Sequence, residues 1–311
     1  MVSPFMEGLP VQYAWDSTSL GWLKECPRKY FYSMIEGWRP KHEAVNLKFG
    51  ALYHAALELY DRSLSEGKDH DEAQIDAVAY CLTNTWEPAN GDRPAGPWLS
   101  DHNTKTRETL VRSVVWYLEQ FGARDPAKTI QLANGKPAVE LTFKLELDFG
   151  PAAHVNYILC GHLDRLVGYA EGTYGMDRKT SSTTLSSNYF DQYDPDNQMS
   201  LYTLACKVIY ATPVKGIIID AAQIAVGFTR FSRGFTYRTD AQLDEWLDDS
   251  RYWFEMQRRF AEMNKWPMND KSCHKYGGCH FRKVCSKSPE VRDIFLHTDF
   301  IKQPWNPLIP R

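Results

Sequence analysis

The spacing of apolar residues changes along the chain from a helical period to a strand period. Segments 17–38, 47–67 and 72–121 repeat apolar side chains every three or four positions, and a Pro/Gly-rich stretch at 87–98 interrupts the third. Segment 139–149 instead alternates strictly, with six apolar residues on one face and five polar residues on the other. This pattern predicts a helical region followed by a half-buried strand.

Strands and helices alternate through the rest of the chain. The pattern predicts strands at 156–170 and 176–181, joined by a turn at 171–175 into an antiparallel hairpin. It also predicts, in order, a helix at 197–210, strands at 216–231 and 234–239, and an amphipathic helix at 240–264. The predicted fold class is therefore α/β, with a mixed central β-sheet flanked by helices and a helical N-terminal region.

Composition limits the classes of function. The 311 residues include 36 basic and 39 acidic side chains, a net charge of -3, which argues against non-specific coating of nucleic acid but permits a local basic channel. No signal-type N-terminus and no apolar run of membrane length is visible, so we expect a cytoplasmic protein without membrane contact. The G-x(4)-G-K-[ST] phosphate-binding loop is absent, which excludes an ATP-driven helicase of that class.

The predicted hairpin places acidic residues on neighbouring strands. Asp177 and Lys179 are two residues apart, so their side chains share one face, and Asp164 precedes Asp177 by thirteen residues on the facing strand. Two adjacent carboxylates repel unless a cation lies between them, and Mg²⁺ or Mn²⁺ is the natural occupant. Lys179 would then orient an attacking water or stabilise developing charge. The alternative is an ordinary surface ion pair.

Three polar residues on predicted helices extend this cluster. His54 lies among apolar residues, where a histidine either packs in the core or ligates a borderline divalent ion such as Mn²⁺. Gln198 and Tyr202 are four residues apart and share a helical face. They form either a routine polar edge or a contact for a phosphate or a base.

The seven cysteines include a regular group near the C-terminus. Cys273, Cys279 and Cys285 are six residues apart, and Gly277 and Gly278 allow the loop to fold back. Their thiolates suit a tetrahedral Zn²⁺ site, a [4Fe–4S] cluster or, if no metal binds, free thiols. Candidates for a fourth ligand are Cys26, His274 and His280, with Cys26 preferred because Cys81, Cys160 and Cys206 fall in apolar patterns.

Taken in chain order, these features resemble the PD-(D/E)XK nuclease superfamily. The resemblance is to its RecB-like branch with an iron–sulfur cluster, which includes CRISPR-associated and phage-encoded exonucleases. The segments that carry it are STSLGWLKECPRKYFY, GALYHAALE, GHLDRLVG, DRKTS, QMSLY and YGGCHFRKVC. The resemblance implies a restriction-endonuclease-like core and a single nuclease domain over 1–311, composed of a helical region at 17–125, a catalytic sheet and helix at 137–240, and a C-terminal helix with a cysteine clasp at 241–288.

The resemblance also implies roles for individual residues. The metal ligands would be His54, Asp164 and Asp177, and Lys179 would be the catalytic lysine. Gln198 and Tyr202 would form a Q-x(3)-Y element at the catalytic and nucleic-acid-binding site, and Glu140 matches a strand position that is acidic in some members. The [4Fe–4S] ligands would be Cys26, Cys273, Cys279 and Cys285. The chain departs from the common pattern in having Asp177 rather than Glu and a cysteine spacing wider than C-x(2)-C-x(5)-C.

The activity implied is that of a metal-dependent deoxyribonuclease. It would act as an exonuclease on single-stranded DNA or DNA ends, with Mg²⁺ or Mn²⁺, in phage-type replication, recombination or repair. A separate helicase or recombination protein would be its partner, and the bacterial host cytoplasm its location if a phage encodes it. The alternative is a non-catalytic nucleic-acid-binding or scaffold protein with the same fold and cysteine clasp.

Overall fold

A computed structural model describes residues 3–41, 44–91, 94–149, 156–209, 213–275 and 278–309. The chain divides into two compact units, each assembled from separate segments. The central unit comprises Glu43–Leu141 and His162–Arg238, and the terminal unit comprises Met1–His42, Thr142–Gly161 and Thr239–Arg311. The single nuclease domain expected from the sequence stays a prediction.

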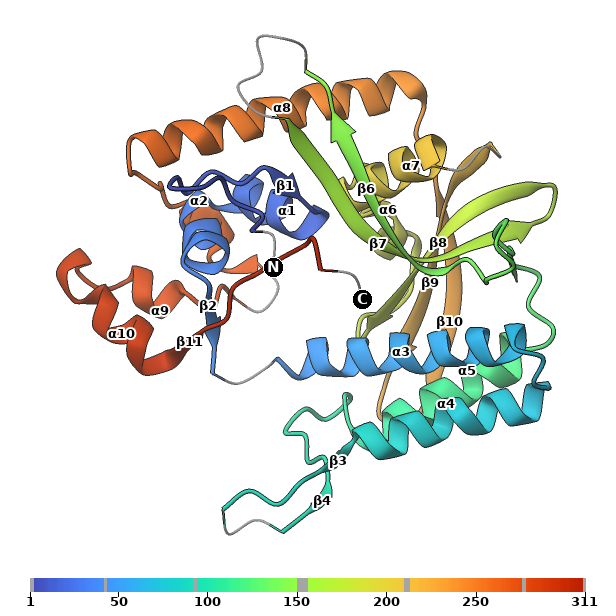
Figure 1. Ribbon diagram of the computed structural model, residues 1–311. Helices are drawn as coiled ribbons and strands as arrows, with labels where there is room; N and C mark the ends of the chain where they lie inside the picture. Colours follow the sequence, from blue (N-terminus) through green and yellow to red (C-terminus); the bar gives the residue numbers. More distant parts are fainter. Residues whose placement is uncertain are drawn as a thin grey trace. The chain divides into compact units, whose positions relative to one another are not determined.

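A mixed β-sheet forms the framework of the central unit. Strand β8 (Gly172–Ser181) lies between β7 (Tyr157–Tyr169), to which it is antiparallel, and β9 (Val214–Ile224), to which it is parallel. β10 (Thr229–Thr236) pairs antiparallel with β9. Two further strands pair with β7, namely β5 (Lys128–Thr129) and β6 (Val139–Leu147), and both β6 and β7 continue into the terminal unit (Figure 1). The predicted α/β class with a mixed sheet is confirmed.

Two predicted turns lie elsewhere in the structure. Residues 172–175 continue strand β8, paired from Gly172 opposite Tyr169, so the predicted turn at 171–175 is wrong in extent. The second hairpin turns at 225–228, where the Ala225 N–H donates to the Phe228 carbonyl, rather than between 231 and 234. Both errors have one cause: glycines and aromatic residues continue through these strands, so local composition does not mark the turns.

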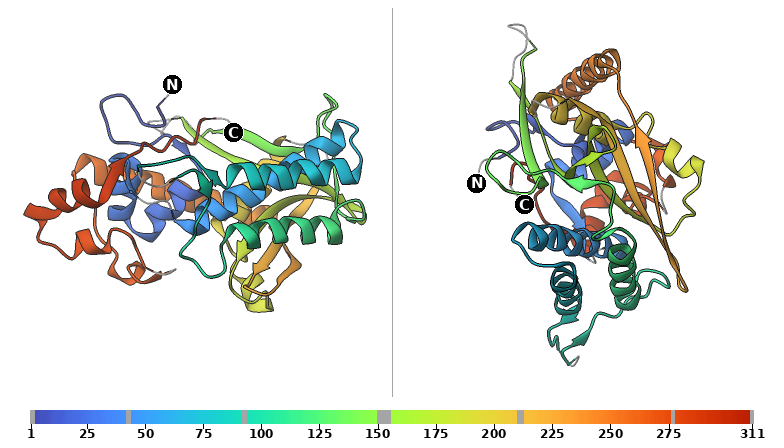
Figure 2. Two further views of the ribbon diagram at one scale, coloured as in Figure 1. Left: turned by 90° about the horizontal axis from the view of Figure 1, so that it is seen from below. Right: turned by 90° about the vertical axis from the view of Figure 1, so that its right-hand side faces the viewer.

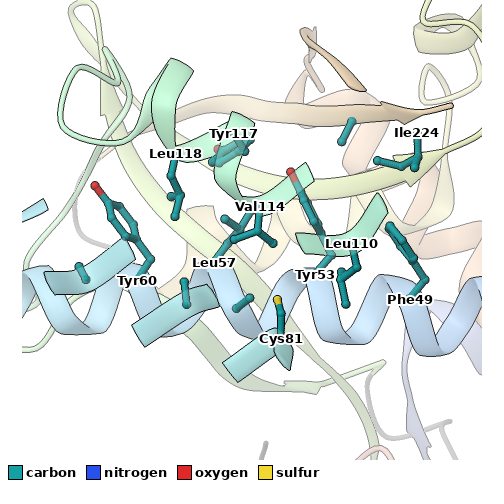
Figure 3. Packing of buried hydrophobic residues seen from close by; sticks show 14 of the residues in the cluster. Phe49, Tyr53, Leu57, Tyr60, Cys81, Leu110, Val114, Tyr117, Leu118 and Ile224 are labelled. Atoms are coloured by element: carbon teal, nitrogen blue, oxygen red, sulfur yellow. The ribbon is translucent and has the colours of Figure 1, made fainter. Parts of the chain in front are cut away.

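Three helices cover one side of the sheet in the central unit. They are α3 (Val45–Ser65), α4 (His70–Asn84) and α5 (Arg107–Phe121), and the right-hand view of Figure 2 shows them side by side. Residues three or four positions apart on each helix face a common core, which includes Tyr53, Leu57, Leu110 and Val114. Figure 3 shows this packing, with the Cys81 sulfur inside it. Cys81 is therefore a core thiol, and burial raises its pKa to about 12.

The opposite side of the sheet carries α7. This helix (Asn197–Ile209) connects the parallel strands β8 and β9, as such a crossover requires. The short helix α6 (Ser187–Asp191) precedes it (Figure 1). The Pro/Gly-rich stretch forms a two-stranded hairpin of β3 (Trp86–Glu87) and β4 (Gly96–Pro97) that the apolar pattern did not predict.

The terminal unit joins the two ends of the chain. Its elements are β1 (Ala14–Trp15), α1 (Ser17–Glu25), α2 (Pro27–Tyr30), a π-helix (Phe31–Ile35), β2 (Trp38–Pro40), α8 (Asp240–Glu262), short 3-10 turns (Asp270–Ser272 and Pro289–Val291), α9 (Arg282–Cys285), α10 (Arg292–Asp299) and β11 (Phe300–Lys302). Strand β2 pairs with β11, and Phe281 stacks on Phe300. The helix break expected at Pro27 is present. Across the described ranges, every helix is too short or too polar to cross a membrane.

Candidate active site

The proposed carboxylates lie close together on the β7–β8 hairpin. The pairing of β7 with β8 continues as far as Arg165 opposite Met176. Asp164 and Asp177 come one residue further along their strands, and the backbone N–H of Arg178, the residue after Asp177, donates to Asp164 Oδ2 at 2.7 Å. A side-chain oxygen thus takes the place of a backbone acceptor, which fixes the Asp164 carboxylate beside Asp177. Both side chains are buried, with exposures of 7% and 2%.

Lys179 connects the carboxylates to helix α7. Its Nζ lies 2.7 Å from Asp177 Oδ2, as expected for side chains two residues apart on one strand face. The same Nζ donates to Gln198 Oε1 at 2.7 Å, and Gln198 Nε2 donates to Tyr202 Oη at 2.9 Å. The structure therefore brings four of the candidate residues into one continuous polar chain. The Lys179 side chain is 25% exposed, so this chain opens to solvent.

His54 approaches the site from helix α3. Its Nδ1 lies 3.3 Å from Asp164 Oδ2. One helical turn earlier, Gly50 faces Thr180, and a Cβ there would lie 3.7 Å from Thr180 Oγ1. Burial lowers the pKa of His54, but the charge and hydrogen bond of Asp164 outweigh burial, so the pKa is raised. His54 is therefore an ion-pair partner of Asp164 rather than a packed core histidine.

The two aspartates have opposite pKa shifts. Burial raises the pKa of Asp177 to about 6, reinforced by the Asp164 charge and only partly offset by Lys179. Burial also disfavours ionised Asp164, but His54 and the Arg178 N–H stabilise its charge and lower its pKa. The site thus holds one firmly ionised carboxylate, Asp164, and one, Asp177, whose ionisation is opposed mainly by burial and further by the charge of Asp164.

These residues suit a hard divalent cation, although they do not yet form a closed ligand set. Within the described residues, no three His, Cys, Asp or Glu side chains converge closely enough to hold a metal ion. Asp177 Oδ2, however, is fully buried, and among the described residues it forms an ion pair with Lys179 but no well-aligned hydrogen bond. A cation would offset the burial that chiefly raises the pKa of this carboxyl, together with the added repulsion from Asp164. The donor set therefore fits Mg²⁺ or Mn²⁺, and the ligand roles stay predictions.

Glu140 lies at the level of Asp164 on the neighbouring strand. The Leu166 N–H donates to the Ala138 carbonyl, and Phe143 packs over Gly161. The antiparallel register common to both pairs places Glu140 opposite Asp164. Glu140 has a φ of 47°, in the left-handed region that non-glycine residues rarely adopt. A strained acidic residue beside the carboxylates is consistent with its predicted position near the site.

Metal-dependent stability should increase with pH. Because folding raises the pKa of Asp177 from 3.8 to about 6, the metal-free chain loses stability as the pH rises through that interval. A divalent cation favours the ionised carboxylate and an unprotonated His54, so added Mn²⁺ should raise the melting temperature little near pH 5 and clearly near pH 8. Thermal shift assays on the wild type and Asp177→Asn test this. An equal Mn²⁺ effect at both pH values would contradict the assignment.

A network of buried ion pairs lies behind the site, and the sequence patterns did not predict it. Asp61 Oδ2 accepts from Arg178 Nη2 at 2.7 Å and lies 3.3 Å from Arg165 Nε. Asp125 and Asp220 hold Arg233 in the same layer, at 2.6 Å and 3.0 Å. A signal did exist: Asp61 follows His54 by seven residues, about two turns on the same helical face. Helix α3 thus contacts both Asp164 and the residue following Asp177.

The four proposed cluster cysteines lie in one neighbourhood of the terminal unit. The Asn269 N–H donates to Cys26 Sγ at 3.4 Å, and the Cys279 N–H donates to the Cys273 carbonyl at 3.0 Å. Burial raises the pKa of Cys279, and the charges of Cys26 and Cys273 raise it further. Burial likewise raises the pKa of Cys285, with contributions from Cys279 and Cys26.

A cavity accompanies these cysteines. Its volume is about 490 Å³, and Cys273, His274, Arg282 and Cys285 are among its lining residues. Proximity of four thiols, of which Cys273 and Cys285 line the cavity, fits a cluster or a zinc ion, although the sulfurs do not converge on one point. The predicted turn residue Gly277 lies outside the described residues. The other three cysteines, Cys81, Cys160 and Cys206, are buried in packing positions as expected.

The chain belongs to the PD-(D/E)XK nuclease superfamily, whose family model matches residues 17–286. Two solved structures are similar to it. One, named "Putative exonuclease", from Eubacterium rectale, is 12% identical over 91% of this chain and 92% of its own, with a TM-score of 0.46. The other, SSO0001, is 10% identical over 81% and 84%, with a TM-score of 0.33.

No curated protein matches the chain. The class of protein is nevertheless defined by the family model together with the mixed sheet: this is a nuclease of the PD-(D/E)XK type.

Proposed function

We propose that this protein is a metal-dependent deoxyribonuclease that degrades DNA from its ends as an exonuclease. The observation that carries the proposal is the arrangement of Lys179. Two directions of its ammonium are occupied by Asp177 and Gln198, and the side chain is a quarter exposed beside two buried carboxylates. An ammonium has three N–H donors, so the third can donate to a water or a phosphate oxygen.

Each of the proposed site residues would have its own role in hydrolysis. Asp164 and Asp177, with His54, would hold Mg²⁺ or Mn²⁺, which supplies a Lewis acid and acidifies bound water. Lys179 would orient the attacking water and stabilise negative charge on the phosphate. Gln198 holds the ammonium in position, and Tyr202 in turn orients the Gln198 amide. The hydrogen-bonded chain thereby limits the freedom of Lys179 before substrate arrives.

Cleavage of end-labelled DNA tests this function. Single strands labelled at the 5′ or the 3′ end are incubated with the protein in Mn²⁺, in Mg²⁺ and in chelator. Successive loss of terminal nucleotides with either metal, and none in chelator, is the expected result, and comparison of the two labels gives the polarity. Metal-independent cleavage, or binding of DNA without cleavage, would overturn the proposal. The second outcome would favour a non-catalytic nucleic-acid-binding protein.

We also propose that the chain belongs to the RecB-like branch and that its four clustered cysteines bind a [4Fe–4S] cluster, with Zn²⁺ as the alternative. The mutual proximity of Cys26, Cys273, Cys279 and Cys285 supports a bound metal. Such a cluster would tie the first helices to the C-terminal loop, which already meet through β2 and β11. Unwinding of duplex DNA would require a separate helicase, since the sequence has no phosphate-binding loop of that class.

Replacing one of the four proposed ligand cysteines is expected to lower the amount of metal bound to the protein. Protein purified without oxygen should contain iron and sulfide, and Cys285→Ser should lose most of both and melt at a lower temperature, because metal binding contributes to folding. Metal analysis and visible absorbance measure this. Cys81→Ala, which alters a core thiol of the central unit, is the control and should retain its iron. Zinc without iron would select the alternative, and full iron in Cys285→Ser would contradict the ligand assignment.

A further inference from the structure

Helix α6 is anchored on the same sheet face as the proposed catalytic residues. Asp177 of β8 pairs with Ile219 of β9, and Ile219 pairs with Gly234 of β10. Paired residues of neighbouring strands point to one face, so Gly234 lies on the face of Asp177, two strands away. The ring of Phe190 packs directly against Gly234, where an added Cβ would lie 2.2 Å from a ring atom. Glycine at this position therefore provides the space that seats α6.

The turn after α6 is held at a second point. The carbonyl of Tyr193 accepts hydrogen bonds from Arg238 Nη2 at 2.8 Å and from Thr236 Oγ1 at 3.2 Å. Arg238 is buried and also donates from Nε to Ser200 Oγ of α7 at 3.1 Å. Phe190 thus fixes one end of this segment to β10. Tyr193 fixes the other end to β10 and, through Arg238, to α7.

Two tyrosines project from this fixed segment. Tyr189 and Tyr193 lie one helical turn apart, with hydroxyl oxygens 3.3 Å apart, ring centroids 5.9 Å apart and ring planes at 69°. Both side chains are half-buried rather than part of the core. Burial raises the pKa of each, and the Asp177 charge raises both further, while Lys179 acts on Tyr189 in the opposite direction. The pair therefore lies within electrostatic range of the proposed catalytic residues.

We propose that Tyr189 and Tyr193 form a stacking platform for an unpaired nucleobase next to the cleaved phosphate, and that the site therefore takes single-stranded DNA. The inference rests on the proposed nuclease function. A base exposes its π-face to an aromatic side chain only when it is unstacked and unpaired, and such contacts tolerate any base. Because the segment is fixed before substrate binds, little conformational entropy is lost on stacking. Tyrosine combines a rigid apolar ring with a hydroxyl that tolerates water.

The platform would complement the few positive charges near the site. Near the site, Lys179 and His54 have partly exposed side chains, at 25% and 27%, whereas Arg178 and Arg238 are 2% and 6% exposed and are held in ion pairs with Asp61 and Asp194. Binding of a flexible strand through base stacking, in addition to its phosphates, suits an enzyme with a net charge of -3.

Paired substrates and paired variants test the platform. One single strand carries normal terminal nucleotides, and a second of equal length carries abasic nucleotides at the end that is cleaved. For the wild type we expect kcat/KM to be roughly tenfold higher on the normal strand, as stacking on one aromatic residue suggests. Tyr189→Ala and Tyr193→Ala should lower kcat/KM on the normal strand by about that factor, mainly through KM, and leave the abasic strand nearly unchanged. Tyr189→Phe and Tyr193→Phe should retain the preference.

Two controls separate stacking from structural damage and from failure of the nuclease assignment. Tyr252→Ala removes an exposed tyrosine of α8 and should behave as the wild type. A strand with terminal 2-aminopurine, mixed with Lys179→Ala protein, reports stacking by loss of fluorescence without any need for cleavage. Equal losses on both strands in the alanine variants, or no quenching by a protein that cuts DNA, would overturn the platform. Quenching without any wild-type cleavage would overturn the nuclease proposal alone.

Discussion

Replacing Lys179 with alanine is expected to reduce DNA cleavage by roughly 10²–10³-fold, the usual effect of removing one group that stabilises charge in a transition state. Lys179 is the residue whose ammonium contacts both Asp177 and Gln198. Loss of the Lys179 ammonium would also leave the Asp177 carboxylate buried beside Asp164 without a neighbouring positive charge. The pKa of Asp177 should therefore rise further above 6. Cleavage rates at several pH values and Mn²⁺ concentrations measure both effects.

Two further lysine substitutions separate a catalytic role of Lys179 from a general effect of positive charge. Lys215→Ala removes an exposed lysine from the neighbouring strand β9 and should leave the rate unchanged. Circular dichroism should show that Lys179→Ala is folded. Lys179→Arg keeps the charge but changes the donor geometry, so we expect an intermediate rate. A Lys179→Ala protein that cuts DNA at the wild-type rate would show that the proposed site is not the active site.

Replacing Asp61 with alanine is expected to destabilise the central unit by about 3–5 kcal/mol, because removing one partner leaves buried charges uncompensated. Arg178 and Arg165 both contact Asp61, and their side chains are only 3% and 5% exposed. Asp61→Asn should be milder, since an amide oxygen still accepts a hydrogen bond. Denaturant unfolding measures the loss.

Comparison with an exposed pair isolates the effect of burial. Lys68 and Asp76 lie 2.6 Å apart, a distance similar to that of the Asp61–Arg178 pair, but their side chains are 43% and 30% exposed. Asp76→Ala should cost clearly less stability than Asp61→Ala, because solvent screens this pair and the main loss is the hydrogen bond that Ser63 donates to Asp76. Replacing Asp61 by Leu and Arg178 by Met together should recover part of the loss seen in Asp61→Ala, because no lone charge of that pair remains. Equal effects of Asp61→Ala and Asp76→Ala would contradict this account.

Local patterns sufficed to locate most of the site. The alternation along 139–149 and the hairpin of the two strands within 156–181 depend on residues only a few positions apart, and a period of two determines which side chains share a face. That period predicts that the side chains of Asp177 and Lys179 share one face, and the hairpin predicts that Asp164 lies on the facing strand. Gln198 and Tyr202 follow in the same way from a spacing of one helical turn, and the structure shows them bonded to one another.

Tertiary structure decided the features that support these residues. Asp61 and Arg178 are 117 positions apart, and Arg238 and Tyr193 are 45 apart, so no periodicity links them. The position of the tyrosine pair depends on the packing of Phe190 against Gly234, and Cys26 contacts Asn269 although the two residues are 243 positions apart. The sequence by itself therefore determined which side chains share an element and a face, because backbone geometry repeats over a few residues. Which faces meet was decided only by packing of the whole chain, since burial of apolar surface and of charge is a property of all the contacts together.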